Sequence, residues 1–258
     1  MFERYIGIDY SGAQTPTSSL KGLRVYQAHR GSPAEEIPPP SSTRKYWTRK
    51  GVAEWLVSAL ETGATTFVGI DHAFSFPLKY FSQCGVSGEW KAFLDDFQQY
   101  WPTDGDNVYV DFVRDGLCGA GALRSGDRRW RRMTEVRAHT AKSVFHFDVQ
   151  GAVAKSTHAG LPWLRYVGNR LGANVFFWPF GGWMPPSGTS VIAEVYPALW
   201  NKSFPQVDRT PDQHDAFAIA EWTRQQDERG LLEGFFRPNL SEHEKVAAQI
   251  EGWILGVQ

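Results

Sequence analysis

The sequence predicts an α/β fold in which helices flank a mixed sheet, and two observations support this. Short apolar runs at 4–12, 65–77 and 189–197 are typical of buried strands. Helical patterns at 48–63 and 211–226 alternate with these runs along the chain, as expected of an α/β domain. The 258 residues, 42% of them hydrophobic, are enough for one domain with a sizeable core.

The N-terminal elements follow in a simple order. "RYIGIDYSG" (4–12) predicts a strand and a turn, and "GLRVYQAH" (22–29) predicts a second strand. The Pro- and Ser-rich stretch "SPAEEIPPPSS" (32–42) predicts a loop, and we also expect a further edge strand before the first helix. That helix spans 48–63, and Gly63 marks its end.

The strand at 65–77 precedes a long segment, 78–188, that is rich in Trp, Arg, Gly and Pro. We interpret it as an insertion or cap on the sheet, so that 1–258 forms a single domain. Within it, "SGEWKAFLDDFQQYW" and "LPWLRYVGNRLG" predict helices, and "NVFFWPF" predicts a strand. The strand at 189–197 and helices at 211–226 and 241–254 complete the pattern.

Composition limits the classes of function. A net charge of -1 and a pI near 6.7 give no overall attraction to nucleic acid or membrane, so polyanion binding would need a local patch. Cys84 and Cys118 provide neither a disulfide framework nor a zinc quartet. The first residues do not resemble a signal peptide, and no apolar run is long enough for a membrane span. We therefore expect a cytoplasmic protein without a membrane partner.

Acidic residues recur where the predicted strands end. Asp9, Asp71 and Glu194 lie near the carboxyl ends of three strands, and Asp212 and Asp215 open the helix after the last of these. Sites in open α/β sheets form outside the carboxyl ends of the strands. We expect the acids to converge there.

Clustered carboxylates raise one another's pKa unless a cation neutralises them. Oxygen ligands favour Mg²⁺ or Mn²⁺, and the chain offers no Cys or His pair for zinc. Two such ions are a standard device for hydrolysing phosphodiester bonds. The pattern predicts a metal site held by all five acids, with Asp9, Asp71, Glu194 and Asp215 catalytic.

Four short motifs carry a family resemblance: "IGIDYSG", "GIDHAFSFP", "EVYPALW" and "DQHDAFAIA". Together with "AKSVFHFDVQGAVAKSTHAGLPWL", "WPF" at 178–180 and the closing "EGWILGV", they resemble the RNase H-like family of predicted nucleases known as domain of unknown function four-two-nine. The pattern at 212–220 is also similar to the last helix of RuvC-type resolvases. The resemblance covers most of the chain and implies an RNase H-like sheet, a metal-dependent nuclease and a nucleic-acid partner.

The resemblance implies roles for particular residues. Asp9 matches the first-strand aspartate, Asp71 the fourth-strand acid, Glu194 the glutamate of an E-x-x-P element, and Asp215 the helix aspartate, with Asp212 beside it. The first-helix glutamate of classical ribonuclease H has no clear match; Glu54 and Glu61 are candidates, and Glu194 is an alternative. DNA and RNA, single and double strands, and a monomer and a homodimer all stay open.

Each acid also has a structural interpretation. Asp9 and Asp71 fit turns or caps after strands, Glu194 fits an edge strand, and Asp212 and Asp215 fit the first turn of a helix. His72 and His214 adjoin proposed metal ligands and are candidates for proton transfer or for plain structural hydrogen bonds.

A basic strip within "RSGDRRWRRMTEVR" is the candidate nucleic-acid contact. Its cations would hold phosphates and its Trp would stack on a base; the alternative is a solvated face paired with Asp127 and Glu135. The strip consists of Arg128, Arg129, Trp130, Arg131 and Arg132.

Two other functions compete with the nuclease. An ATP-binding protein of the actin and sugar-kinase kind also uses this type of sheet, but its Asp-x-Gly turn is one residue shorter than Asp9-Tyr10-Ser11-Gly12. A binding module that lost its chemistry would retain carboxylates that cost stability without a metal. Metal binding without nucleotide favours the nuclease, and stabilisation by ATP favours the first alternative.

Overall fold

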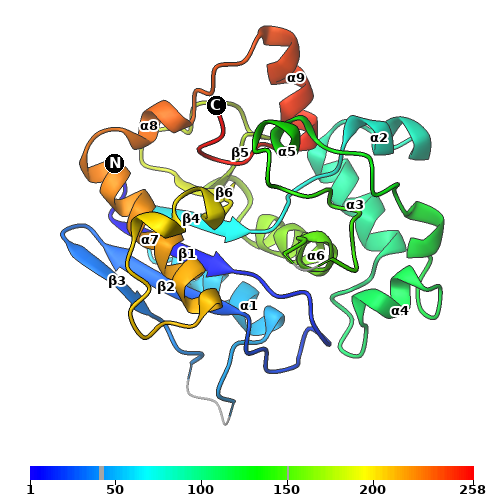
Figure 1. Cartoon of the computed structure of the whole chain (residues 1–258), viewed down its shortest axis with the longest axis horizontal. Helices are drawn as coiled ribbons and strands as arrows, with labels where there is room; N and C mark the ends of the chain where they lie inside the picture. The colour runs from blue at the N-terminus through cyan, green and yellow to red at the C-terminus, as the bar shows by residue number, and fades with distance from the viewer. Residues whose placement is uncertain (41–43, 150) are drawn as a thin grey trace.

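The computed structural model describes residues 1–40, 44–149 and 151–258. Figure 1 shows a twisted sheet in the middle of the molecule with helices on both faces. No helix in these residues is long and apolar enough to cross a membrane.

Six strands form one mixed sheet in the order β3-β2-β1-β4-β6-β5. β1, β2 and β3 form an antiparallel meander, while β4, β6 and β5 continue from β1 in parallel. The strands are β1 (Arg4–Asp9), β2 (Arg24–His29), β3 (Ser32–Glu36), β4 (Thr66–Asp71), β5 (Val175–Trp178) and β6 (Ser190–Glu194).

Helices cover both faces of the sheet. α7 lies against β1, β2 and β4 on one face, and α1 and α6 pack together over the other. The helices are α1 (Arg49–Leu60), α2 (Leu78–Cys84), α3 (Trp90–Tyr100), α4 (Val110–Arg114), α5 (Met133–Arg137), α6 (Ala154–Leu171), α7 (Pro211–Glu228), α8 (Leu232–Phe235) and α9 (Glu242–Glu251). Short 3-10 turns are η1 (Gly121–Arg124), η2 (Gly172–Asn174), η3 (Pro197–Leu199) and η4 (Asn201–Ser203).

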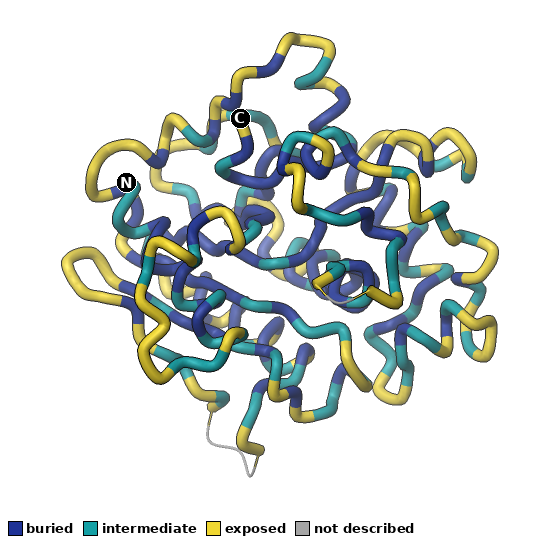
Figure 2. The backbone as a smooth tube through the Cα atoms, in the orientation of Figure 1, coloured by how far each residue is buried: buried dark blue, intermediate teal, exposed yellow. Residues whose placement is uncertain are grey.

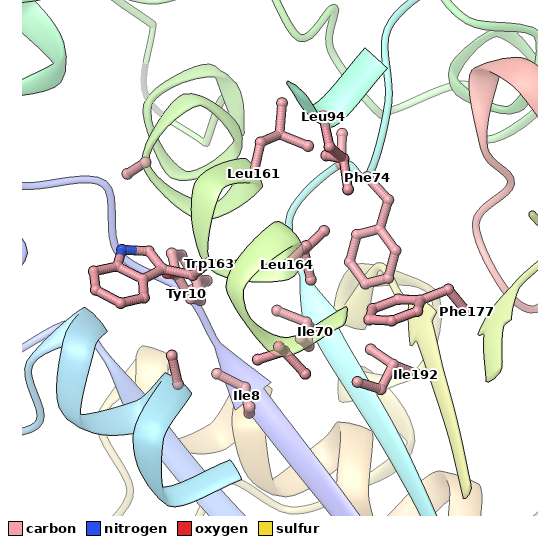
Figure 3. Close-up of a cluster of buried hydrophobic side chains, with 14 of the residues drawn as sticks. Ile8, Tyr10, Ile70, Phe74, Leu94, Leu161, Trp163, Leu164, Phe177 and Ile192 are labelled. Atoms are coloured by element: carbon pink, nitrogen blue, oxygen red, sulfur yellow. The ribbon is translucent and has the colours of Figure 1, made fainter. Parts of the chain in front are cut away.

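The sheet separates two apolar cores because alternate side chains of a strand point to opposite faces. Ile8, Ile70 and Ile192 join the core beneath α1 and α6, which Figure 3 shows in close-up. Phe67 and Val191 join the core beneath α7. The buried backbone in Figure 2 follows this layered arrangement, and exposed segments are concentrated in the connections.

Two facing glycines let α7 approach the sheet closely. Gly7 and Gly69 are register partners in β1 and β4. A Cβ on Gly7 would lie 2.2 Å from the carbonyl oxygen of Ala216, and one on Gly69 would lie 2.5 Å from Ile219. The close contact fixes where the N-terminal half of α7 lies on the sheet. Gly7 and Gly69 are each two residues before the aspartate that ends the strand, Asp9 or Asp71.

Most predicted elements are confirmed with shorter bounds. The edge strand expected before the first helix is β3, which occupies residues 32–36, so the prediction that these residues form part of a loop is wrong. Pro33 is tolerated because an edge strand need not donate every backbone N–H. Residues 41 and 42 of that predicted loop lie outside the described residues.

The segment 78–188, interpreted as an insertion, contributes directly to the central layers. β5 pairs with β6 at the edge of the sheet, and α6 packs against α1. α6 begins seven residues before the predicted helix and continues through Pro162, whose missing N–H lies within the helix.

Candidate metal centre

Asp9 and Asp71 end two neighbouring parallel strands and are direct register partners. They belong to the face that α7 covers, because Ile8 and Ile70 point into the opposite core. Both residues are partly exposed, and neither carboxylate receives a hydrogen bond or an ion pair from the described residues. The structure therefore brings two carboxylates side by side without a contacting cation.

The electrostatic setting of this pair is unfavourable for two negative charges. Burial, followed by the charges of Asp71, Asp212 and Asp215, raises the pKa of Asp9 well above its usual range, and Arg24 partly opposes this. Burial, Asp215 and Glu194 likewise raise the pKa of Asp71. A cation at this point would relieve the repulsion.

The first two turns of α7 bring two more carboxylates to the pair, Asp212 and Asp215. Thr210 is the N-cap and forms a capping box with Gln213, so neither Asp212 nor Asp215 serves as the cap. The carboxylate of Asp212 lies beside the β1–β2 connection, where a Cβ on Gly22 would be 3.6 Å from Oδ2. Capping by Thr210 leaves both acids free for another role.

Asp215 is held by a residue that the sequence did not indicate. The side-chain amide of Asn201 donates to Oδ1 of Asp215 at 2.8 Å, and His214 Nε2 donates to the backbone oxygen of Asn201 at 2.9 Å. Burial raises the pKa of Asp215, while Asn201 and His214 lower it. Asn201 lies in η4, 14 residues before Asp215, and no sequence pattern links the two.

Glu194 occupies a different setting from the four aspartates. It is the register partner of Ile70, so its side chain belongs to the face opposite Asp9 and Asp71. Both of its carboxylate oxygens bind the Arg132 guanidinium, at 2.5 and 2.7 Å, and Oε2 also accepts from the backbone N–H of Phe74. Glu194 is therefore close enough to Asp71 to raise its pKa, but both of its oxygens are already bound by Arg132.

Arg132 links this region to the rest of the molecule. Its side chain is 1% exposed and also binds Glu135 at 2.9 Å. Burial lowers the pKa of Arg132, but Glu194 and Glu135 outweigh burial and raise it. A cavity of about 20 Å³, roughly the size of one water, adjoins Arg132, Glu194 and Asp71.

The remaining residues of the basic strip are mostly engaged locally. Arg129 is exposed and pairs with Asp127 at 2.7 Å, and Arg131 donates to the carbonyl oxygens of Glu135 and Ala141. Trp130 is half-buried and packs edge-on against Phe145 of the core. Arg128 is exposed, with no hydrogen bond or ion pair among the described residues.

Other candidate residues have structural partners or lie elsewhere. His72 is buried, its Nδ1 donates to the carbonyl oxygen of Ala73, and burial lowers its pKa to about 4, so the ring is neutral at pH 7. Glu54 and Glu61 are exposed on or beside α1. A cavity of about 740 Å³ lies between α3, α6, β5 and α9 and is lined by none of the candidate acids.

The four aspartates suit a hard cation in chemistry, although they do not form a closed ligand set. Within residues 1–40, 44–149 and 151–258, no three His, Cys, Asp or Glu side chains are already arranged around one point. All candidate donors are carboxylate oxygens, the type that Mg²⁺ and Mn²⁺ prefer. The fit rests on the adjacent Asp9 and Asp71, with Asp212 and Asp215 in electrostatic range.

No family model, curated protein or solved structure matches the chain.

Proposed function

We propose that the protein is a metal-dependent nuclease with an RNase H-like fold. The observation that carries the proposal is the register pairing of Asp9 and Asp71 at the carboxyl ends of β1 and β4, without a contacting cation among the described residues. The antiparallel β1–β3 meander followed by parallel β4 supports the RNase H-like assignment.

Asp9, Asp71 and Asp215 would hold Mg²⁺ or Mn²⁺, with Asp212 as a further oxygen ligand. Such an ion supplies Lewis acidity, which makes water a better nucleophile and stabilises charge on phosphate oxygens. The protein orients the ligands: the glycine contact places α7, and Asn201 holds one oxygen of Asp215. Glu194 is left out of the proposed ligand set because Arg132 already binds both of its oxygens.

His72, next to Asp71 in the sequence, does not neutralise the aspartates. The low pKa of His72 keeps its ring uncharged at neutral pH, so the ring adds no positive charge beside Asp71. The repulsion between the aspartates is therefore left for a cation to relieve. Hydrolysis of a phosphodiester bond in nucleic acid is the chemistry that best suits this donor set.

Calorimetric titration with Mn²⁺, in the absence of nucleotide, tests the metal site. Wild type should bind, and Asp9→Asn should bind at least about tenfold more weakly, a loss of about 1.4 kcal/mol. Asp208→Asn is the matched control, because it removes the same charge from an exposed position. Equal affinities for wild type and Asp9→Asn would refute the site.

A cleavage assay then tests the activity itself. Single- and double-stranded DNA and RNA should be compared with Mn²⁺, with Mg²⁺ and with a chelator. Cleavage should require the ion and should be lost in Asp71→Asn. Metal-independent cleavage, or cleavage that survives this substitution, would contradict the mechanism.

A further inference from the structure

A groove of about 430 Å³ lies at the N-terminal end of α7, outside the basic strip identified from the sequence. The connection between β1 and β2, the segment after β3 and the first turn of α7 form its walls. Arg24, one of its residues, is the register partner of Asp9 across β1 and β2. Its described lining includes Lys21, Arg24, Lys45, Tyr46, Thr210 and Gln213.

The groove lies next to Asp212 of the proposed metal centre, although none of the four aspartates lines it. Thr210 and Gln213 flank Asp212 on α7, and Gly22, next to Lys21, lies close to the Asp212 carboxylate. The positive charge of Arg24 also acts on Asp9, because it partly opposes the rise in the pKa of that carboxyl group. A ligand lying in this groove would therefore lie beside Asp212, from which its continuation would reach the other aspartates.

The groove carries a net positive charge. Its acid, Glu36, is already neutralised: Arg24 binds it at 2.9 Å, and the amide of Gln213 donates to it at 2.7 Å. Lys21 and Lys45 are exposed, and neither forms an ion pair with a carboxylate in the described chain. Two positive charges thus face solvent without a compensating acid.

Two cations of the groove, Arg24 and Lys45, lie over the ring of Tyr46. The guanidinium of Arg24 lies 4.7 Å from the centre of its ring, and the Lys45 ammonium lies 5.4 Å from it. A cation within about 6 Å of an aromatic ring is attracted by it, which favours positions of both cations beside Tyr46. The arrangement differs from the basic strip, where Arg129 is paired with Asp127 and Arg132 is buried against two glutamates.

We propose that this groove binds the sugar-phosphate backbone of a single nucleic-acid strand and leads it to the aspartates. The inference rests on the proposed function and specifies the part of the substrate that is recognised. Lys21 and Lys45 contact phosphates, and binding is independent of base sequence because charge alone provides the attraction. A polyanion suits the site because the groove's lysines lie beside the aspartates. Their attraction for the phosphates of the nucleic acid offsets the repulsion between those phosphates and the aspartates.

Fluorescence anisotropy with labelled twelve-nucleotide single strands of DNA and RNA tests this assignment without metal. The Lys21→Glu/Lys45→Glu variant should bind roughly tenfold or more weakly, and the slope of log affinity against log salt should flatten by about 1.4, or 0.7 per lost phosphate contact. DNA and RNA should lose affinity equally if the backbone is what is bound. A larger loss for one of them would overturn sugar-independent recognition.

The Arg128→Glu/Arg129→Glu variant is the matched control, because it changes the net charge equally at the rival basic strip. It should alter affinity less than about threefold and leave the salt slope unchanged. An equal loss in both variants, or a loss confined to the control, would overturn the groove. Stronger competition by poly-glutamate than by unlabelled oligonucleotide would instead indicate an acidic peptide as the ligand and would equally overturn the proposal.

Mn²⁺ calorimetry on the same variants separates this inference from the proposed function. Both double variants should retain wild-type Mn²⁺ affinity within about threefold, since neither removes an aspartate. If wild type binds Mn²⁺ but no oligonucleotide at low salt, the groove assignment fails and the metal centre stands. If oligonucleotide binding depends on the two lysines but Mn²⁺ does not bind, the groove stands and the metal centre fails.

Discussion

Asp71 and Glu194 end neighbouring strands and adjoin one small cavity, yet their hydrogen-bond partners differ. Asp71 faces Asp9 with no contacting cation among the described residues, whereas Glu194 is paired with a buried guanidinium. The difference follows from the register: Ile70, not Asp71, is the partner of Glu194, so the two carboxylates point to opposite faces. At the scale of single residues, strand register decides which acids are candidates for a metal.

Replacing Arg132 with Ala should strongly destabilise the protein. The substitution would leave Glu194 and Glu135 buried without their partner, which costs about 3–5 kcal/mol. Urea unfolding would measure the loss. Arg129→Ala is the comparison, since its ion pair with Asp127 is solvent-exposed and should contribute little. Similar small effects for both substitutions would show that the buried network does not support the fold.

At the scale of elements, the placement of α7 links the packing of the sheet to the proposed chemistry. The helix approaches the sheet where Gly7 and Gly69 lack side chains, and its first two turns carry Asp212 and Asp215. A shift of the helix would therefore move both acids relative to Asp9. The same contact serves stability and the geometry of the site.

Gly7→Ala should test this coupling. The new Cβ would lie 2.2 Å from the backbone oxygen of Ala216, so helix or strand must move, at a cost of about 1–3 kcal/mol. We expect lower stability in urea and weaker Mn²⁺ binding together. Gly234→Ala is the control, because a Cβ there meets no atom within 4 Å. If the Gly7→Ala protein is destabilised but binds Mn²⁺ with wild-type affinity, the contact between α7 and the two glycines does not position Asp212 and Asp215.

At the scale of the whole molecule, the sequence predicted the α/β class and most central elements because their apolar patterns are strong. It predicted an edge strand before the first helix but not its position, because Pro33 and two glutamates make 32–36 resemble a loop, and an edge strand needs only one apolar face. It also treated β5 and α6 as parts of an insertion, since nothing local shows that Val175–Trp178 pairs with a strand later in the chain.

The candidate site was only partly predictable for a similar reason. Asp9 and Asp71 follow obvious buried strands, so their convergence follows from parallel pairing. The partners of Glu194 and Asp215 are 62 and 14 residues away, and such contacts leave no periodic signal. Lys21 and Lys45 are far apart along the chain, so only the folded structure shows that they line one groove. The arginines of the basic strip are nearly contiguous, and the sequence alone therefore indicated them as a candidate nucleic-acid contact.

The proposed metal centre should make the stability of the whole protein depend on metal in a particular way. A carboxyl group whose pKa is raised in the fold favours its protonated form, so its stabilising contribution is complete at low pH and is lost as pH rises through the folded pKa. At neutral pH without metal, Asp71→Asn should therefore stabilise the protein, by about 0.5–2 kcal/mol as is common for substitutions at functional sites. Each kcal/mol corresponds to about 2–4 °C in Tm for a chain of this size.

Adding Mn²⁺ should reverse the order of the two proteins. An ion at one hundred times its Kd stabilises the native state by about 2.7 kcal/mol, so wild type should gain and Asp71→Asn should not. Thermal scans with and without Mn²⁺ measure both effects, and Asp208→Asn, exposed on the loop before α7, should behave as wild type does. Destabilisation of the metal-free protein by Asp71→Asn would mean that the aspartates contribute to the fold rather than strain it. That result would remove the electrostatic reason for placing a cation between β1 and β4.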